Sequence, residues 1–67
     1  MVNTELLREK IDSSGVKITF LAKEIGITYM ALTNKMNKKV DFKCEEAGAI
    51  KKALRLTDEE MKEIFFA

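Results

Sequence analysis

Residues 17–39, KITFLAKEIGITYMALTNKMNKK, decide the fold of this chain. Apolar residues recur at helical spacing on both sides of Gly26, which predicts one helix over residues 19–25 and another over residues 28–36. Gly26 tolerates the left-handed backbone conformation that ends a helix, and Thr28 has a hydroxyl that can cap the next helix. The stretch therefore predicts two short helices joined by a tight turn, which is the arrangement of a helix-turn-helix.

The two helices are expected to share a core formed by their facing apolar side chains. A small residue at Ala22 lets the helix backbones approach closely, and Ile27 in the turn can pack into the angle between them. Lys35 falls on the same inward arc, where its apolar stem can cover the core while its ammonium group reaches solvent or phosphate. The predicted core residues are Leu21, Ala22, Ile25, Ile27, Leu32 and Met36.

The outward arc of the second helix is polar and carries no charge when the chain is wound at about 100° per residue. Phenol, thioether, hydroxyl and carboxamide groups can hydrogen-bond base edges or contact a thymine methyl group in the major groove of DNA. The residues that we expect to face DNA are Thr28, Tyr29, Met30, Thr33, Asn34 and Asn37. Asn34 is the strongest candidate for a bidentate contact with adenine, because a carboxamide matches the donor and acceptor of that base.

The chain carries a net charge of +1 over 67 residues, but the charges are unevenly distributed. Residues 1–16 sum to −1, residues 17–39 to +4 and residues 40–67 to −2, so the predicted reading helix lies in the cationic segment. The residues expected to contact phosphate flank that helix and are Lys17, Lys38 and Lys39. Four excess charges make a weak field, so non-specific affinity for DNA should be modest and strongly salt-dependent.

Ala22, Gly26 and Leu32 stand at the spacing of the Cro and phage-repressor family of helix-turn-helix proteins, which this chain resembles. In that family a small Ala lies in the first helix of the motif, a Gly follows four residues later, and an apolar anchor comes six residues after the Gly. The resemblance covers nearly the whole chain. It implies a single all-α domain over residues 1–67, with a compact five-helix lambda-repressor-like fold and the helix-turn-helix at its second and third helices. It also implies transcriptional control.

Two further helices are predicted before and after this motif. A first helix, capped by Asn3 or Thr4, runs to about residue 13. A fourth helix covers residues 43–54, and Gly48 inside it indicates either a close helix contact or a tolerated surface glycine.

The segments that border the motif are less strongly specified. Residues 37–42 are expected to form a packed loop, because so short a segment has no partner strand elsewhere in the chain. In the family this loop often has a Gly near Lys38 or Lys39, which this chain lacks. The start of the second helix is open between two positions, since Lys17 stands where many relatives have a capping hydroxyl and Thr19 follows two residues later.

Thr57 and Glu60 have the spacing of a capping box, which predicts a fifth helix over residues 58–65. The end of this helix is apolar, and adjacent residues point about 100° apart, so one Phe can fill the core while the other stays exposed. A symmetric dimer contact and a frayed apolar tail are the two interpretations of this end. The residues of the predicted dimer interface are Ile64, Phe65 and Phe66.

Composition argues against membrane insertion and against catalysis. No apolar run approaches the roughly 18 residues of a membrane span, and the N-terminus lacks a secretory hydrophobic region, so a cytoplasmic protein is expected. The chain has no His and a single Cys44, which leaves no disulfide, no metal site and no partner for nucleophilic chemistry. We therefore expect no enzyme activity, no cofactor and no small-molecule substrate, and we expect Cys44 to be a buried apolar side chain.

These features favour a sequence-specific regulator of transcription that binds double-stranded DNA, of the phage-repressor and Cro type, with residues 28–36 in the major groove. One reading helix covers about four or five bases, which is too few to select one site in a genome. A homodimer on a near-palindromic site is therefore expected, paired either in solution or only on DNA. The alternatives are a helix-turn-helix domain that holds another protein, as in an antitoxin-like module, and a plain helical bundle.

Overall fold

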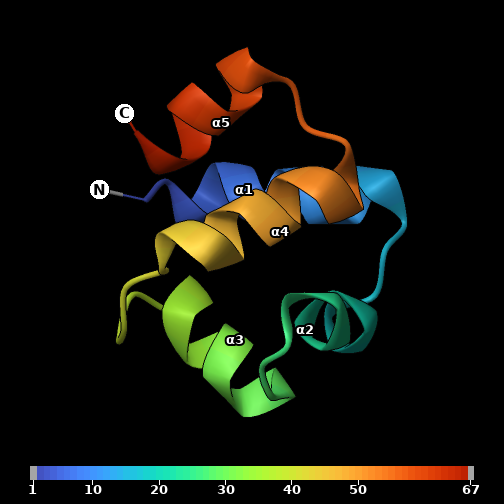
Figure 1. Ribbon diagram of the computed structural model, residues 1–67, viewed down its shortest axis with the longest axis vertical. Coiled ribbons are helices and arrows are strands. Elements are labelled where there is room, and N and C mark those ends of the chain that lie inside the picture. The colour runs from blue at the N-terminus through green and yellow to red at the C-terminus, as the bar shows by residue number, and fades with distance from the viewer. Residues whose placement is uncertain (1, 67) are drawn as a thin grey trace.

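The computed structural model describes residues 2–66, which contain five helices and no strand (Figure 1). The all-α fold class predicted from the sequence is confirmed. The segment 37–43 is irregular, as predicted for residues 37–42, but only Phe42 of its apolar side chains packs against the core, while Val40 is 52% exposed. The helices are α1 (Thr4–Ser14), α2 (Ile18–Ile25), α3 (Tyr29–Met36), α4 (Cys44–Leu54) and α5 (Asp58–Phe65).

Side-chain caps and left-handed residues account for most helix boundaries. Asn3 begins α1, because its Oδ1 accepts a hydrogen bond from the Leu6 N–H at 3.1 Å. Gly15 ends α1 in the left-handed region at φ 75°. The sequence leaves the N-cap of α2 open between two positions. In the structure the N-cap is Lys17, and its side chain makes no capping hydrogen bond.

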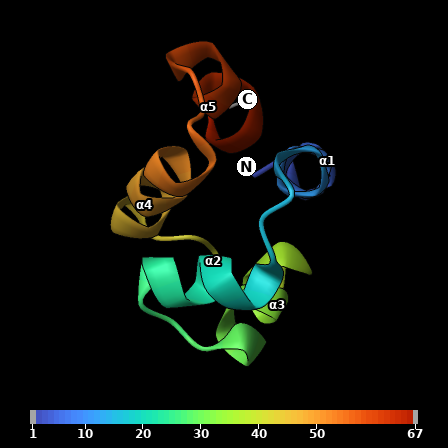
Figure 2. The same ribbon diagram turned by 90° about the vertical axis from the view of Figure 1, so that its right-hand side faces the viewer.

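The helices form a middle layer with one group at each end of the molecule. α1 and α4 cross the middle, α5 lies at one end of the longest axis, and α2 and α3 lie at the other (Figures 1 and 2). α2 packs against α3 and α4, while α1 packs against α4 and α5. The Asn3 N–H donates to the Ile64 carbonyl oxygen at 2.6 Å, which ties the start of the chain to the end of α5. α3 and α5 are therefore at opposite ends of a molecule 27 Å long.

Every helix contributes one fully buried side chain to a single core. These side chains are Leu7, Leu21, Leu32, Ile50 and Ile64, one from each of α1 to α5. Of the core predicted around the turn, Leu21, Ala22, Leu32 and Met36 are buried, and Ile25 and Ile27 are partly buried against the same cluster. The apolar side chains of the motif thus join the core that all five helices share.

Two expectations about α4 are resolved by its position in the fold. The prediction that Cys44 is buried is wrong: its side chain is exposed, because it lies at the first position of α4, beyond the part of the helix that its neighbours cover. The buried residues of this helix begin at Glu46 and Ala47. Gly48 faces open space, with nothing within 4 Å of the position a Cβ atom would take, so it is a surface glycine and not a close helix contact.

None of the helices within residues 2–66 has the length and hydrophobicity needed to cross a lipid bilayer. The same residues contain no cluster of three or more His, Cys, Asp and Glu side chains arranged to hold a metal ion.

Candidate nucleic-acid interface

Three consecutive residues set the direction in which α3 leaves α2. Gly26 adopts φ 88°, and its N–H donates to the carbonyl oxygen of Ala22 at 2.9 Å, which closes α2. The N–H of Ile27 donates to the same oxygen at 3.0 Å, while the Ile27 side chain packs against the core. Thr28 then caps α3, because its Oγ1 accepts a hydrogen bond from the Ala31 N–H at 3.0 Å. The parts predicted for this turn are all present.

The face of α3 that points away from the core carries no charge, as expected from the sequence, and combines two large exposed side chains with polar ones. Tyr29 and Met30 are 54% and 66% exposed, at the start of the helix. Thr33 is half-buried, and its hydroxyl donates to the carbonyl oxygen of Tyr29 at 2.9 Å. Asn34 is also half-buried, and its carboxamide takes part in none of the side-chain hydrogen bonds found among residues 2–66. Its donor and acceptor both stay free for a ligand.

The C-terminal end of α3 leads directly into two exposed lysines. Lys38 adopts the left-handed conformation at φ 64°, which glycine adopts without strain. Its N–H donates to the Lys35 carbonyl oxygen at 3.1 Å, and the Lys39 N–H donates to the Asn34 carbonyl oxygen at 2.9 Å. These bonds hold the lysines beside the last turn of α3, while Lys17 is exposed at the N-terminal end of α2.

Arg8 of α1 joins this end of α3, although no sequence pattern indicates it. Its Nη2 donates to Oδ1 of Asn37, the C-cap residue of α3, at 2.9 Å. This bond uses one lone pair of the Asn37 oxygen, so Asn37 keeps both N–H donors and one acceptor position for a ligand. Arg8 and Asn37 are 29 positions apart, so only the tertiary fold brings them together. Arg8 therefore adds a cation to the predicted interface.

The prediction that the Lys35 ammonium group reaches solvent or phosphate is wrong. Its Nζ donates to Glu46 Oε1 at 2.8 Å and to the Asp41 carbonyl oxygen at 3.2 Å, in a buried position. The same Glu46 oxygen accepts the Lys43 N–H at 2.8 Å. Burial acts to raise the pKa of Glu46, but the hydrogen bonds from Lys35 and Lys43 outweigh it and lower the pKa. The Glu46 carboxylate is therefore held in its charged form, and the Lys35 charge is neutralised inside the fold.

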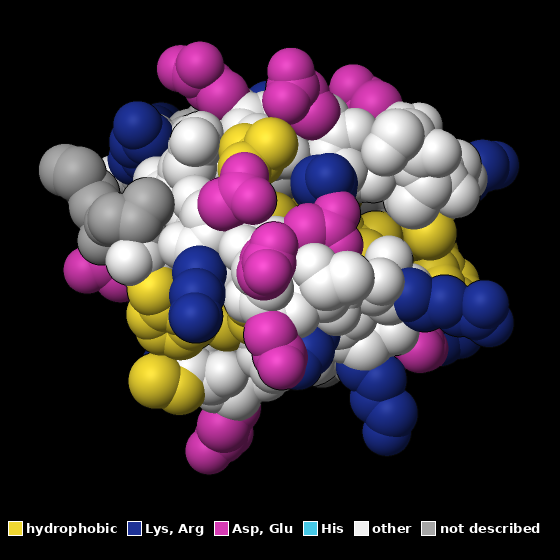
Figure 3. All heavy atoms as spheres, turned by 90° about the horizontal axis from the view of Figure 1, so that it is seen from above, with side chains coloured by type: hydrophobic (Ala, Val, Ile, Leu, Met, Phe, Trp, Pro, Cys, Tyr) yellow, Lys and Arg dark blue, Asp and Glu magenta, His cyan; other side chains and the backbone are white. Residues whose placement is uncertain are grey.

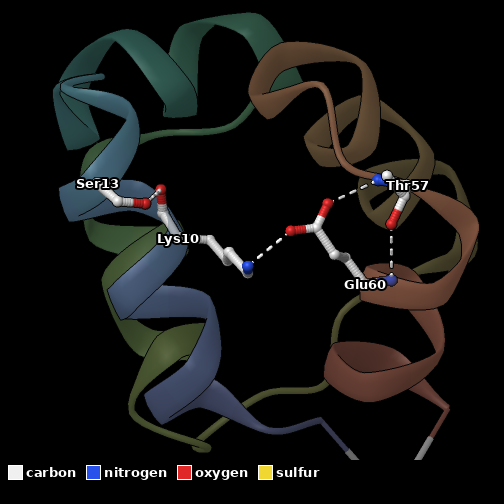
Figure 4. A network of polar contacts seen from close by, with 4 residues as sticks. All are labelled: Lys10, Ser13, Thr57 and Glu60. Atoms are coloured by element: carbon white, nitrogen blue, oxygen red, sulfur yellow. Dashed lines mark hydrogen bonds and ion pairs between the residues drawn. The ribbon is translucent and has the colours of Figure 1, made fainter.

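The opposite end of the molecule has the opposite charge. Asp58, Glu59 and Glu60 all lie in the first turn of α5, and acidic side chains are prominent over this end (Figure 3). Glu60 accepts the Thr57 N–H at 2.8 Å and pairs with Lys10 of α1 at 2.6 Å (Figure 4). The Lys10 hydrogen bond is the main reason that the pKa of Glu60 falls to about 2, and the backbone N–H of Thr57 adds to it. The same contact raises the pKa of Lys10.

The three residues predicted to form a dimer interface differ in exposure. Ile64 is fully buried, and Phe65 is buried with its ring edge-on to that of Phe42, the centroids 5.7 Å apart. Phe66 follows α5 and is 69% exposed. One Phe fills the core and the next faces solvent, as the sequence predicted. Of the three residues, only Phe66 has its side chain available to a second copy, and the dimer itself stays a prediction.

Comparisons of this chain with protein-family models, with curated proteins and with solved structures give no match.

Proposed function

We propose that this protein is a sequence-specific transcriptional regulator of the phage-repressor and Cro type, which reads the major groove of double-stranded DNA with α3. The observation that carries the proposal is the solvent-facing arc of α3, which carries no charge, includes hydrogen-bonding side chains and is flanked by exposed cations. A solvated helix face would carry Glu and Lys, and a face that packs on another protein would carry an apolar stripe. A regulator of this type would work in the cytoplasm.

The hydrogen-bond donors and acceptors that remain unused on the outward face of α3 indicate which residues would contact bases and which would contact phosphates. Asn34 keeps both a donor and an acceptor, which suits bidentate recognition of adenine. The exposed side chains of Tyr29 and Met30 suit contact with a thymine methyl group, and the Thr33 hydroxyl keeps acceptor capacity. Asn37 keeps both of its N–H donors, which suit a phosphate oxygen.

Phosphate contacts would come from both sides of the reading helix. Lys17 flanks it on one side, and Lys38 and Lys39 on the other, with Arg8 as a fourth cation. The acidic end formed by α5 lies away from α3, so its repulsion of DNA would favour the same orientation (Figure 3). Replacing Lys17, Lys38 or Lys39 by Gln should lower the slope of log affinity against log salt by about 0.9 for each lysine that binds a phosphate.

Selection from random duplexes, followed by sequencing, tests sequence-specific binding. We expect one enriched, near-palindromic site. Asn34→Ala should then weaken binding to that site by about 1–3 kcal/mol and relax the preference at one base position. Lys62→Gln, an exposed change on α5, is the matched control and should leave the base preference unaltered. An unchanged preference in Asn34→Ala would remove Asn34 from the reading role.

Dimerisation on DNA would double the number of bases that are read. Pairing would occur near Phe66, the exposed apolar side chain that follows α5, and the two reading helices of such a dimer would need to lie about 34 Å apart. Sedimentation with a palindromic duplex should give two protein chains per duplex, and Phe66→Asp should weaken that complex. A two-to-one complex with unchanged affinity and cooperativity in Phe66→Asp would exclude Phe66 from the interface, and a one-to-one complex on every selected site would exclude the dimer.

A second candidate is a domain that binds another protein through the same surface, as in an antitoxin-like module. The observation in its favour is the exposure of three large apolar or aromatic side chains on α2 and α3, namely Phe20, Tyr29 and Met30. The selection separates the two candidates, because a protein-binding module would enrich no duplex sequence above background.

A further inference from the structure

The Lys35–Glu46 pair is the one ion pair within residues 2–66 whose two side chains are both nearly buried. Their exposed fractions are 8% and 10%, against 33% and 28% for Lys10–Glu60 and 42% and 84% for Lys51–Asp58. A buried ion pair contributes little more to stability than a well-packed apolar pair of the same volume, since both charges lose their hydration. Stability alone therefore does not explain why charges occupy this position.

The contacts of the pair enclose the loop that follows α3. Lys35 lies in the last turn of α3, and its ammonium group holds the Asp41 carbonyl oxygen as well as Glu46. Glu46 in the first turn of α4 in turn holds the Lys43 N–H. The second half of the segment 37–43 is thus fastened, at Asp41 and Lys43, to one pair of side chains that joins α3 to α4. An ammonium group can donate to a carboxylate and a carbonyl at once, which no apolar side chain can do.

Lys38 and Lys39 lie inside the segment that these contacts enclose. We propose that Lys35 and Glu46 are positioning residues, which hold the loop so that Lys38 and Lys39 lie against the DNA backbone beside the end of α3. This inference rests on the proposed function. Lys35 itself makes no contact with DNA, because its charge is turned into the fold and neutralised there.

The variant that tests this role removes both charges and leaves the rest of the site intact. In Lys35→Met with Glu46→Gln, Met replaces the lysine stem, and the Gln carbonyl oxygen can still accept the Lys43 N–H. No buried charge is left unpaired, so the domain should stay folded.

The opposite end of the molecule offers a matched control. Lys10→Met with Glu60→Gln removes a lysine–glutamate pair whose glutamate also caps its own helix, at a site far from α3 (Figure 4). Any effect common to the two double variants would come from the loss of an ion pair in general.

Backbone hydrogen exchange, measured by NMR without DNA, reports whether the loop is held. In the Lys35 and Glu46 double variant, the amides of Lys39 and Lys43 should exchange at least about tenfold faster than in the wild type, since the loop opens locally more often. The control should leave both rates unchanged. Unaltered exchange in the first variant would show that the pair does not hold the loop, and would overturn the inference.

Binding to the selected duplex as a function of salt reports whether the loop places its lysines. The Lys35 and Glu46 double variant should lower the slope of log affinity against log salt by about 0.9 if one lysine loses its phosphate, and by about 1.8 if both do. Each lost contact should weaken binding about eightfold at about 0.1 M salt. A purely structural role would leave the salt slope unchanged, so faster exchange with a wild-type slope would also overturn the inference.

Two further outcomes keep the inference separate from the proposed function. If the wild type binds no duplex, the proposed function fails and the positioning role fails with it, whatever the exchange rates show. If the double variant does not fold, Lys35→Gln with Glu46→Gln takes its place, because it also removes both charges, leaves no buried charge unpaired and keeps a hydrogen-bonding group at each position. It should show smaller changes in both measurements, and wild-type values in either would overturn the inference.

Discussion

Glu46 and Glu60 occupy the same position in two helices, yet their surroundings differ. Each is the third residue of its helix, and each accepts a hydrogen bond from its N-cap N–H at 2.8 Å. Each also pairs with a lysine from another helix, Lys35 at 2.8 Å for Glu46 and Lys10 at 2.6 Å for Glu60. The first pair is buried at the cationic end of the molecule, and the second is partly exposed at the acidic end.

The difference shows that burial, and not the bonding pattern, decides what such a pair does. Around Glu60 water can replace the lysine at small cost, so the pair mainly helps to cap α5 and to join it to α1. Around Glu46 little water has access, so loss of one partner leaves a charge without compensation. The same local pattern is thus a minor contact at one end of the molecule and a structural requirement at the other.

The largest expected effect follows from breaking only one side of the buried pair. Lys35→Met should lower the free energy of unfolding by about 3–5 kcal/mol, because Glu46 is left buried and unpaired. Lys10→Met should have a much smaller effect, since Glu60 can turn to water. Urea denaturation of the two variants measures both values, and equal losses would show that burial does not distinguish the pairs.

A smaller effect is expected from the threonine caps of α3 and α5. Thr28→Ala and Thr57→Ala should each cost about 1 kcal/mol in stability, because each hydroxyl satisfies one N–H at a helix start. Only Thr28→Ala should also weaken DNA binding, since its cap begins the reading helix. Denaturation combined with binding to the selected duplex checks this, and a similar loss of binding in Thr57→Ala would contradict it.

The loop held by the buried pair stores a small amount of backbone strain. Lys38→Gly should raise the free energy of unfolding by no more than about 1 kcal/mol, because glycine adopts φ 64° without strain but loses more entropy on folding. Lys39→Gly, two residues from the C-cap, lacks this benefit and is the matched control. Thermal unfolding gives both values, and a clear loss of stability in Lys38→Gly would mean that its side chain matters more than its backbone.

The smallest effect is the pH dependence contributed by the exposed pair. The pKa of Glu60 is lowered from 4.5 to about 2, so its contribution to stability is present above pH 4.5 and is lost as the pH falls toward 2. Exposure to water keeps this contribution small. NMR titration of the Glu60 carboxyl group should give a value well below 4.5, and Glu60→Gln should remove this part of the acid dependence. A carboxyl that titrates at its ordinary value would contradict the contact with Lys10.

Features encoded by neighbouring residues were predictable from the sequence, and features created by packing between distant helices were not. The Thr57 and Glu60 cap, the Gly26 turn and the Thr28 cap each lie within four residues and follow from local chemistry. The Glu46 cap was missed because its N-cap residue, Lys43, has no side-chain acceptor and so provides no capping signal.

The candidate site shows the same division. The outward arc of α3 follows from helical periodicity, and its exposed and half-buried side chains agree with that expectation. Contact between Arg8 and Asn37 depends on the tertiary arrangement of residues 29 positions apart, which no local pattern records. Lys35 was expected to reach solvent because a lysine usually does so, and the acceptor that turns it inward lies 11 residues away on α4. Helical spacing predicts which face of α4 Cys44 lies on, but it does not predict whether other helices cover that end of α4. The expected burial of Cys44 is therefore wrong.

Titration of the labelled protein with the selected duplex, followed by NMR of the backbone amides, tests the central claim most directly. We predict that shift changes concentrate on residues 28–39, on Lys17 and on Arg8, while the acidic first turn of α5 stays unchanged. Changes centred on α5, or none on α3 at saturating duplex, would contradict the assignment of α3 as the reading helix.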